Sequence, residues 1–416
     1  MDTVAVIGGG ISGLAAAYLL GRRHRVFLFE RETRLGGHTH TVDVDGPDGH
    51  VRLDTGFLVH NDRTYPNLVR LFRELDVATA DSDMSFGVSC RATGLEYSSR
   101  GVLGFFAQPR NAVSPSHFWL LAEILRFNRE APALLAAPDG ASVTLGDFLD
   151  ARNFGDEFTN RYLLPMASAI WSTSLEAIRT FPAVTLVRFF ANHGLLGLTS
   201  QPVWKVVVGG SDTYIPRLTA GLGDRVVLGA VIDGVRRSDT GVTLTFFDRP
   251  AMTVDHVVFA CHGNQVLPLL ADATDAEREV FAHFRTTRNT VCLHTDQTLL
   301  PARPRARASW NYLLGGRPDA PPAVTYDLNR LQGLQARERY CVTLNAQVPI
   351  DPSKVLRRLE YAHPLFTLDA IRAQARWRAV SGVVRTHYCG AYWGYGFHED
   401  GLNSAIRVAA TLGVDW

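Results

Sequence analysis

The chain is poor in lysine and shows no excess of charge of one sign. Lys205 and Lys354 are its only lysines, so 40 of its 42 basic residues are arginine, and 41 acidic residues balance them. The formal net charge of +1 lacks the basic excess that is typical of nucleic-acid-binding proteins. We therefore expect no nucleic-acid partner.

Cysteine is scarce too, and no two cysteines are spaced as a metal-binding or disulfide motif. The five lie far apart, at Cys90, Cys261, Cys292, Cys341 and Cys389. Without a CxxC pair, this spacing indicates neither a zinc site nor a disulfide framework, and we expect no bound metal. Cys261 and Cys341 fall in strand-like segments and are expected to be small core residues.

Long apolar runs are missing as well. No stretch reaches the ~18–20 apolar residues of a transmembrane helix, and the first strand begins at Val4, which leaves no room for a signal peptide. We therefore expect a cytoplasmic protein, with peripheral contact at the inner face of the membrane left open. With 416 residues, 46% of them hydrophobic, the chain is long enough for two domains around one large buried site.

A glycine-rich segment at residues 4–30 is the most informative feature that the chain does contain. Its pattern predicts a buried strand, a helix rich in Ala and Leu, and a second strand, at Val4–Ile7, Ile11–Leu20 and Val26–Phe29. Glycines at 8, 10 and 13 follow the first strand. A strand, a GxGxxG turn and a helix in this order are typical of dinucleotide-binding Rossmann domains.

Each glycine has a mechanical role in such a turn. Gly8 allows the tight bend, Gly10 lets the backbone approach a pyrophosphate, and Gly13 lets the helix pack closely on the strand. The free N–H groups at the start of the helix, around Ile11 and Ser12, then face the phosphates.

An acid follows the second strand at a suitable distance. Glu30 lies 17 residues after Gly13 and can accept hydrogen bonds from the ribose hydroxyls of an adenosine. Arg31 comes next, followed by the pair Gly36-Gly37, which lets a loop lie flat along the cofactor. This combination resembles the extended FAD fingerprint of the flavin amine oxidase and phytoene desaturase superfamily.

The resemblance implies FAD as the cofactor and extends to later segments. The GG-x-x-x-L pattern at 209–218, the strand predicted at Val226–Ile232 and the strand predicted at Val257–Cys261 match the same family. No flavin attachment motif is present, so we expect the FAD to be bound non-covalently. Besides the residues above, the resemblance assigns cofactor contacts to His38, Thr39, Gly56, Phe57, Val231, Ala260, Glu399 and Leu402.

The same resemblance implies an α/β fold in which a Rossmann-type FAD-binding domain is interwoven with a mixed-sheet and helical substrate domain, as in the amine oxidases. We expect residues 1–75, 205–270 and 375–416 to form the FAD-binding domain, and residues 76–204 and 271–374 the substrate domain. In the first substrate segment the pattern predicts a helix that Ser116 caps, preceded by Pro115, and helices at 144–152 and 155–170. In the second it predicts strands at Thr290–His294, Ala308–Leu313, Ala323–Leu328 and Cys341–Asn345.

Four further segments, at 53–68, 308–312, 324–332 and 388–401, resemble a bacterial flavoprotein group that is associated with cyclopropane fatty acid synthases. That group includes the acyl desaturase of furan fatty acid biosynthesis. The resemblance implies desaturation of a methylated or otherwise modified fatty acyl chain of a membrane phospholipid, with hydride transfer to flavin N5. It also implies a functional pairing with a fatty acid methyltransferase.

Desaturation of an alkyl chain needs a group that takes a proton and a dry apolar channel. Tyr326 and His398 are the candidate proton acceptors, and Asn329 and Gln332 are polar residues that can face the flavin. Aromatic walls could come from Trp310, Tyr312, Tyr326, Trp393, Tyr395 and Phe397, although several of these residues could equally belong to the core.

Three other functions stay open: a flavin-dependent fatty acid double-bond isomerase, an oxidase of a small amine, and a flavin-bound accessory protein of a lipid methyltransferase. An ordinary amine oxidase is disfavoured, because such enzymes often place a lysine near flavin N5. Neither Lys205 nor Lys354 falls in the strands expected there, and His38 stands where an arginine is usual.

A peripheral membrane contact is expected where aromatic residues gather near arginines. Phe105, Phe106, Phe118 and Trp119 could form a docking surface at the entrance of the acyl channel, with arginines at the lipid headgroups. The alternative is a helix that packs these aromatic residues inside its own domain.

Overall fold

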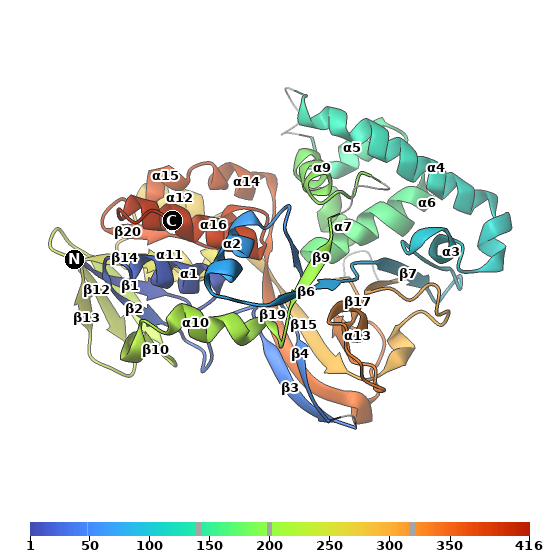
Figure 1. The fold of residues 1–416 in the computed structure, drawn as a ribbon. Coiled ribbons are helices and arrows are strands. Elements are labelled where there is room, and N and C mark those ends of the chain that lie inside the picture. The colour runs from blue at the N-terminus through green and yellow to red at the C-terminus, as the bar shows by residue number, and fades with distance from the viewer. Residues whose placement is uncertain (48, 138–142, 198–201, 316–321) are drawn as a thin grey trace.

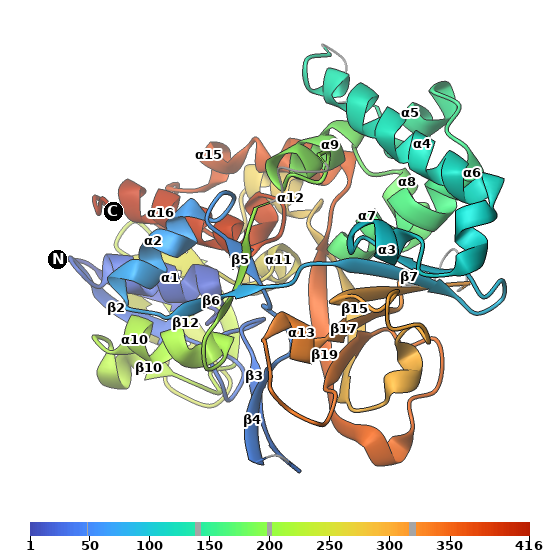
Figure 2. The same cartoon turned by 45° about the vertical axis from the view of Figure 1, so that its right-hand side comes forward.

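The computed structural model describes residues 1–47, 49–137, 143–197, 202–315 and 322–416. The molecule has two halves (Figure 1). One half is built on a five-stranded parallel sheet and contains both termini, and the other combines a seven-stranded sheet with a group of helices. The view in Figure 2 shows the connecting strands in the middle of the molecule, between these halves.

The parallel sheet has the strand order β10-β2-β1-β14-β20. In that order the strands are Val226–Val227, Arg25–Phe29, Thr3–Ile7, His256–Phe259 and Thr386–Tyr388. The apolar run of β1 is buried on both faces, as is usual in parallel sheets that are covered on both sides. Val6 lies opposite Leu28 of β2 and Val258 of β14, which fixes the register at the centre of the sheet.

Helix α1 (Ile11–Leu20) packs on this sheet. Ala15, Ala16 and Ala17 are fully buried, and such small side chains allow close contact with α16 (His398–Thr411). An antiparallel sheet lies on the other side of the strands in Figure 1, formed by β11 (Ile232–Arg237), β12 (Val242–Phe246) and β13 (Met252–Val254). Further helices of this half are α2 (Pro66–Glu74), α10 (Ile215–Thr219), α11 (Val266–Leu269), α12 (Asp275–Phe281), α14 (Leu368–Gln374) and α15 (Trp377–Val380).

Two elements differ from the sequence-based expectation in this half. The single strand predicted at Val226–Ile232 is divided into β10 and β11, because Gly229 adopts a positive φ of 65° and turns the chain. Helices α12 and α14, expected in the substrate domain, contribute Val280, Phe281 and Ala370 to the core around the parallel sheet. The division into two discontinuous domains stays a prediction.

The seven-stranded sheet has the order β19-β15-β18-β17-β16-β7-β8. All neighbours are antiparallel except β16 and β7. The four strands predicted for this region all exist, with ends shifted by a few residues. In sheet order the strands are Val355–Leu365, Arg285–His294, Cys341–Leu344, Val324–Asp327, Trp310–Leu314, Phe86–Cys90 and Glu96–Ser98, and α13 (Leu328–Leu331) follows β17.

The helical region consists of α3 to α9 and has its own aromatic core. Its helices are Gly101–Phe105, Pro115–Glu130, Leu145–Ala151, Asp156–Phe158, Leu164–Trp171, Leu175–Arg179 and Ala183–Asn192. The expected cap at Ser116 is wrong. Helix α4 begins at Pro115 and its N-cap is Ser114, because proline fits the first helical position, where no N–H partner is needed. Within the described ranges, no helix is both long enough and apolar enough to cross a membrane.

Five short strands join the two halves. β3 (Thr41–Gly46) and β4 (Gly49–Asp54) form a hairpin, and β9 (Trp204–Val207) pairs with both β5 (His60–Asn61) and β6 (Thr79–Ser82). Leu53 and Val206 from these strands, and Val59 just before β5, share a buried cluster with Tyr312 and Tyr326 of the seven-stranded sheet. The segments that follow the glycine motifs therefore lie where the halves meet.

Candidate functional site

The turn between β1 and α1 has room only for glycine at two of its positions. Gly8 has a φ of 109°, and a Cβ added there would lie 2.9 Å from the backbone of Ala260. A Cβ on Gly13 would lie 1.8 Å from the carbonyl oxygen of Gly8. These contacts place the start of α1 directly against β1 and the end of β14.

The third glycine faces open space instead. A Cβ on Gly10 would meet no atom within 4 Å, and Gly10 is the N-cap of α1, so no side chain there covers the N–H groups of Ile11 and Ser12. The second glycine pair approaches the same point, since the Gly36 N–H donates to the Gly9 carbonyl at 2.8 Å. An open helix N-terminus beside two glycine loops fits a pyrophosphate group.

Glu30 braces this turn from the end of β2. Its Oε2 accepts the N–H of Gly9 at 2.6 Å, and its Oε1 accepts the N–H of Glu32 at 2.9 Å. The expected neighbour Arg31 instead turns toward the exposed carboxylate of Glu32, at 3.2 Å. Val231 is 38% exposed near this end of the sheet, and its carbonyl accepts the N–H of Phe247.

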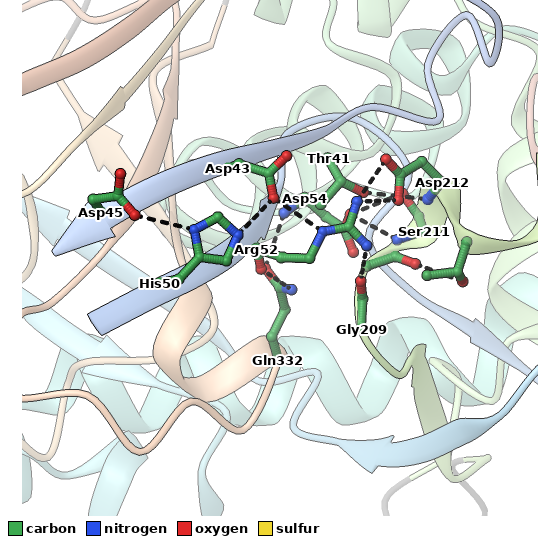
Figure 3. Close-up of polar contacts among 12 residues, drawn as sticks. Thr41, Asp43, Asp45, His50, Arg52, Asp54, Gly209, Ser211, Asp212 and Gln332 are labelled. Carbon is green, nitrogen blue, oxygen red and sulfur yellow. Dashed lines mark hydrogen bonds and ion pairs between the residues drawn. The ribbon is translucent and has the colours of Figure 1, made fainter. Parts of the chain in front are cut away.

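A buried carboxylate holds the second GG turn in place (Figure 3). Asp54, the last residue of β4, accepts hydrogen bonds at Oδ1 from the Thr41 hydroxyl at 2.6 Å and from the N–H and hydroxyl of Ser211, both at 2.8 Å. Its Oδ2 is buried without a partner among the described residues. Burial outweighs these bonds and raises the pKa of Asp54 to about 6.

Arg52 binds the same turn from its solvent-facing side. Its guanidinium binds both carboxylate oxygens of Asp212 at 2.8 Å and the carbonyl of Gly209. His50 and Asp43 extend the network along the hairpin (Figure 3). A cavity of about 380 Å³ lies beside it, lined by the turn and by β4 and β9. Sequence reasoning missed the roles of Asp54 and Arg52, although the Asp-Thr-Gly-Phe segment was a signal for the first.

Two of the residues expected to be catalytic form hydrogen bonds with main-chain groups. Gln332 accepts the N–H of Asp54 at 3.0 Å and donates to the Arg52 carbonyl at 3.1 Å. Asn329 donates to the Glu338 carbonyl at 2.9 Å and accepts the N–H of Tyr340 at 2.8 Å. Each side chain thus bonds to the main chain, and the catalytic roles expected of Asn329 and Gln332 stay predictions.

His398, at the start of α16, lies against the cofactor loops. Its Nε2 is 2.9 Å from the Thr39 hydroxyl, and its ring stacks on Phe57 with centroids 3.7 Å apart. The Thr39 hydroxyl also contacts the hydroxyl of Tyr214. Desolvation by the surrounding protein lowers the pKa of His398 to about 3, so the imidazole is neutral at physiological pH.

His38, directly after the second glycine pair, is also neutral. Its ring centroid lies 5.0 Å from that of Tyr361 and 5.1 Å from that of His363. Desolvation, and then the neighbouring imidazole of His363, lowers the pKa of His38 well below its ordinary value. Its Nε2 is buried and has no hydrogen-bond partner among the described residues. A buried nitrogen without a partner at this point fits a contact with a bound cofactor.

The remaining candidates occupy the start of α16 and β17. Both carboxylate oxygens of Glu399 accept N–H groups at the start of α2, from Asn67 at 3.0 Å and from Leu68 at 2.9 Å. Leu402 is completely buried, and the cofactor contacts expected of Glu399 and Leu402 stay predictions. Tyr326 is buried with its ring edge-on to Trp310, at 5.0 Å, and burial raises its pKa.

The chain matches a family model that is described as "Flavin containing amine oxidoreductase", over residues 11–326. The chain belongs to this family. Among curated proteins it is similar to "Amine oxidase [flavin-containing] A" of Canis lupus familiaris, with 27% identity over 275 residues, which are 63% of this chain and 48% of that protein. The corresponding protein of Bos taurus is 26% identical over 274 residues, with 62% and 49% covered. The chain thus spans about half the length of the curated relatives it matches.

Two solved structures share the fold of this chain. A putrescine oxidase double mutant superposes with a TM-score of 0.71 at 17% identity, and 99% of each chain is covered. A fatty acid isomerase from P. acnes that produces CLA gives a TM-score of 0.71 at 16% identity, with 98% of each chain covered. The expected amine oxidase-like fold is confirmed by these similarities, which at such low identity concern the fold alone.

FAD is the cofactor of this flavin-containing family member, as the sequence predicted. The geometry fits the group: an open helix N-terminus at Gly10, the carboxylate of Glu30 one loop away, and the unpaired Nε2 of His38. The structure brings together Gly8, Gly10, Gly36, His38, Thr39, Phe57 and His398 from four distant segments. It leaves Asn329 and Gln332 outside this group.

Proposed function

We propose that the protein is an FAD-dependent oxidoreductase that desaturates the fatty acyl chain of a membrane phospholipid, with a methylated chain as the preferred substrate class. The observation that carries the proposal is a continuous cluster of apolar side chains that extends toward the cofactor loops, which we call the apolar path. An aromatic and aliphatic cluster runs from α4 to Trp171, Phe189 and Phe397. Phe397 directly precedes His398, whose ring stacks on Phe57.

The aromatic contacts along this path are close and continuous. The rings of Trp171 and Phe189 lie 4.9 Å apart, and those of Phe189 and Phe397 lie 5.1 Å apart and nearly parallel. Tyr395 packs on Phe189 at 6.3 Å. An apolar region of this kind would suit a hydrocarbon chain, because each CH₂ group moved from water into an apolar site is stabilised by about 0.8 kcal/mol. Trp393, by contrast, packs with Phe281 and Phe284 in the other half and forms no part of this path.

The histidines near this path are uncharged. Burial lowers the pKa of His60, His193 and His363 to about 4 in each case, as it does for His398 to about 3. Neutral rings stabilise neither a cationic nor an anionic substrate strongly. Their neutrality therefore favours a substrate whose reacting part has no charge.

The two lysines support the same choice between substrate classes. Lys205, on β9, forms an ion pair with Asp62 at 2.7 Å. The Lys354 side chain is 44% exposed and lies near Asp296. Neither is positioned in the aromatic path. The proposal therefore places an alkyl chain ahead of an amine, although the curated relatives are named amine oxidases.

Desaturation removes a hydride and a proton from adjacent carbons as the double bond forms. Bound FAD would supply the hydride acceptor, and turnover would need an external electron acceptor such as dioxygen or a quinone. His398 and Tyr326 remain the candidate groups for the proton. The neutral His398 ring is already bonded to Thr39, whereas the Tyr326 hydroxyl is held in its protonated form by burial.

Anaerobic mixing of the oxidised protein with defined phospholipids tests the proposal. We expect the flavin absorbance to bleach with methylated acyl chains, and the extracted product to be lighter by two hydrogen atoms. A product of unchanged mass with a moved double bond, formed without an electron acceptor, would establish isomerisation instead. Bleaching by small amines and not by lipid would establish amine oxidation, and no bleaching by either would favour the accessory role beside a methyltransferase.

A further inference from the structure

The helical region carries an exposed apolar patch at its outer end. We define this patch by Val102, Leu103, Val113, Phe118 and Trp119, from α3, the segment before α4, and the first turns of α4. Their exposed fractions are 73%, 66%, 79%, 50% and 68%. Figure 1 shows α3 beside the start of α4, at the end of the molecule far from the two termini.

The patch is held rigidly from behind. His117 is buried, and its Nε2 lies 2.8 Å from the Phe105 carbonyl. The ring of His117 lies 4.2 Å from that of Phe105 and 5.4 Å from that of Phe106, and Phe106 contacts Phe118 at 5.5 Å. Phe105 and Phe106 are partly exposed and pack beside His117 at the base of the patch, and their expected role at the docking surface stays a prediction.

Exposed arginines lie around the patch, and two acids close to them are already engaged: Asp83 lies 3.8 Å from Arg100, and Glu96 accepts the N–H groups of Ala302 and Arg303. Residues 97–122 contain Arg100 and Arg110 and no acid. The loop at 301–307 lies alongside, since the Ser98 hydroxyl donates to the Arg305 carbonyl at 2.9 Å. Arg110, Arg303 and Arg305 are exposed, and within the described part of the chain none of them forms an ion pair with an acid.

We infer that this patch docks the protein onto the surface of a bilayer that contains anionic phospholipid. Aliphatic and aromatic side chains enter the boundary between headgroups and acyl chains, while the arginines bind lipid phosphates. The charge of the surface favours an anionic bilayer over a second copy of this chain as the binding partner. A second copy of this chain would bring Arg110, Arg303 and Arg305 of both copies together, whereas Asp83 and Glu96 are already bonded within each copy.

The docking surface is continuous with the apolar path described above. This connection rests on the proposed function. Phe105 behind the patch and Phe397 beside the cofactor loops pack on the same buried cluster. A lipid chain drawn from the bilayer would thus meet apolar side chains from entry to reaction site. Vesicle binding is measured without catalytic turnover, so its result tests the docking surface independently of the desaturase proposal.

Vesicle sedimentation of the FAD-loaded protein tests the inference. The probes are vesicles of phosphatidylcholine with or without roughly one third phosphatidylglycerol, since anionic lipid attracts basic surfaces. We expect binding only to the anionic vesicles, and weaker binding as salt screens the charges. The double variant Leu103→Ser/Trp119→Ser should bind at least about tenfold more weakly. Arg303→Gln/Arg305→Gln should weaken binding by about fivefold for each arginine.

Phe247→Ser is the matched control, because Phe247 is also 73% exposed but lies in the other half of the molecule. It should bind vesicles like the unchanged protein. Quenching of tryptophan fluorescence by brominated lipid should fall in Trp119→Phe, which retains an aromatic ring for docking. Equal vesicle binding by the double variant and the control overturns the inference. Absence of binding, with a concentration-dependent dimer that the double variant abolishes, also overturns it and assigns the patch to self-association.

Discussion

Replacing Asp54 with asparagine should make the stability of the protein less sensitive to pH. The folded protein raises the pKa of this carboxyl from 3.8 to about 6, because desolvation outweighs its hydrogen bonds. Protonated Asp54 is therefore compatible with its buried site, whereas the ionised form is costly. The stability that this residue contributes is fully present below pH 3.8 and is lost as the pH rises through 6.

The size of the effect follows from the two pKa values. Their difference corresponds to about 3 kcal/mol in the free energy of unfolding, and roughly 2 kcal/mol of this falls between about pH 4.5 and pH 8. The asparagine side chain of the variant cannot ionise, and its amide oxygen can still accept from Thr41 and Ser211. Relative to the unchanged protein, Asp54→Asn should thus gain stability as the pH rises.

Urea unfolding at both pH values, with saturating FAD throughout, measures this difference. Asp81→Asn, which changes an exposed carboxylate on β6, is the control and should show no comparable gain. A stability difference between Asp54→Asn and the unchanged protein that stays constant across this pH range would refute the reasoning. The carboxyl would then be ionised at little cost, and the turn at Gly209 and Gly210 would be held by other contacts.

Further predictions concern the cofactor and the reaction. Glu30→Ala should weaken FAD binding by roughly 1.5–3 kcal/mol, about 10- to 150-fold in Kd by titration of the apoprotein, whereas Glu32→Ala should leave the Kd nearly unchanged. Acid precipitation should release all flavin into the supernatant, and colour in the pellet would contradict non-covalent binding. His398→Ala should slow flavin reduction by about tenfold through lost positioning, and Tyr326→Phe by less. A loss of roughly 10²–10⁴-fold in stopped-flow reduction would identify either residue as the base instead. Gln332→Leu should lower the melting temperature with normal reduction of the remaining folded protein, since the side chain braces β4.

The sequence predicted best those features that depend on the backbone alone. Glycines at 8, 13 and 36 are required because a Cβ would collide with neighbouring main chain or side chains, and such requirements are visible in a local pattern. The apolar runs of β1 and β14 likewise identify buried parallel strands without knowledge of their partners. Element ends were less certain, as the division of 226–232 at Gly229 illustrates.

The side-chain partners of the site could not be predicted in the same way. Gln332 and Asp54 are separated by 278 residues, and His398 and Thr39 by 359. Each pair joins segments that only the tertiary fold brings together, so no spacing rule connects them. Polar residues near a cofactor motif were therefore easy to nominate and hard to assign, and two of the four nominated catalytic residues prove to brace main-chain groups.

The surface patch shows a different limit of the sequence pattern. The segment from Phe105 to Trp119 begins and ends with aromatic pairs, but the direction of their side chains depends on the phase of two helices. On α4, Leu120 and His117 turn inward, so Phe118 and Trp119 face outward. On α3, Gly104 packs on Ser98, which turns Val102 and Leu103 toward solvent. The exposure of this apolar surface beside arginines is therefore what motivates the proposed docking to an anionic bilayer.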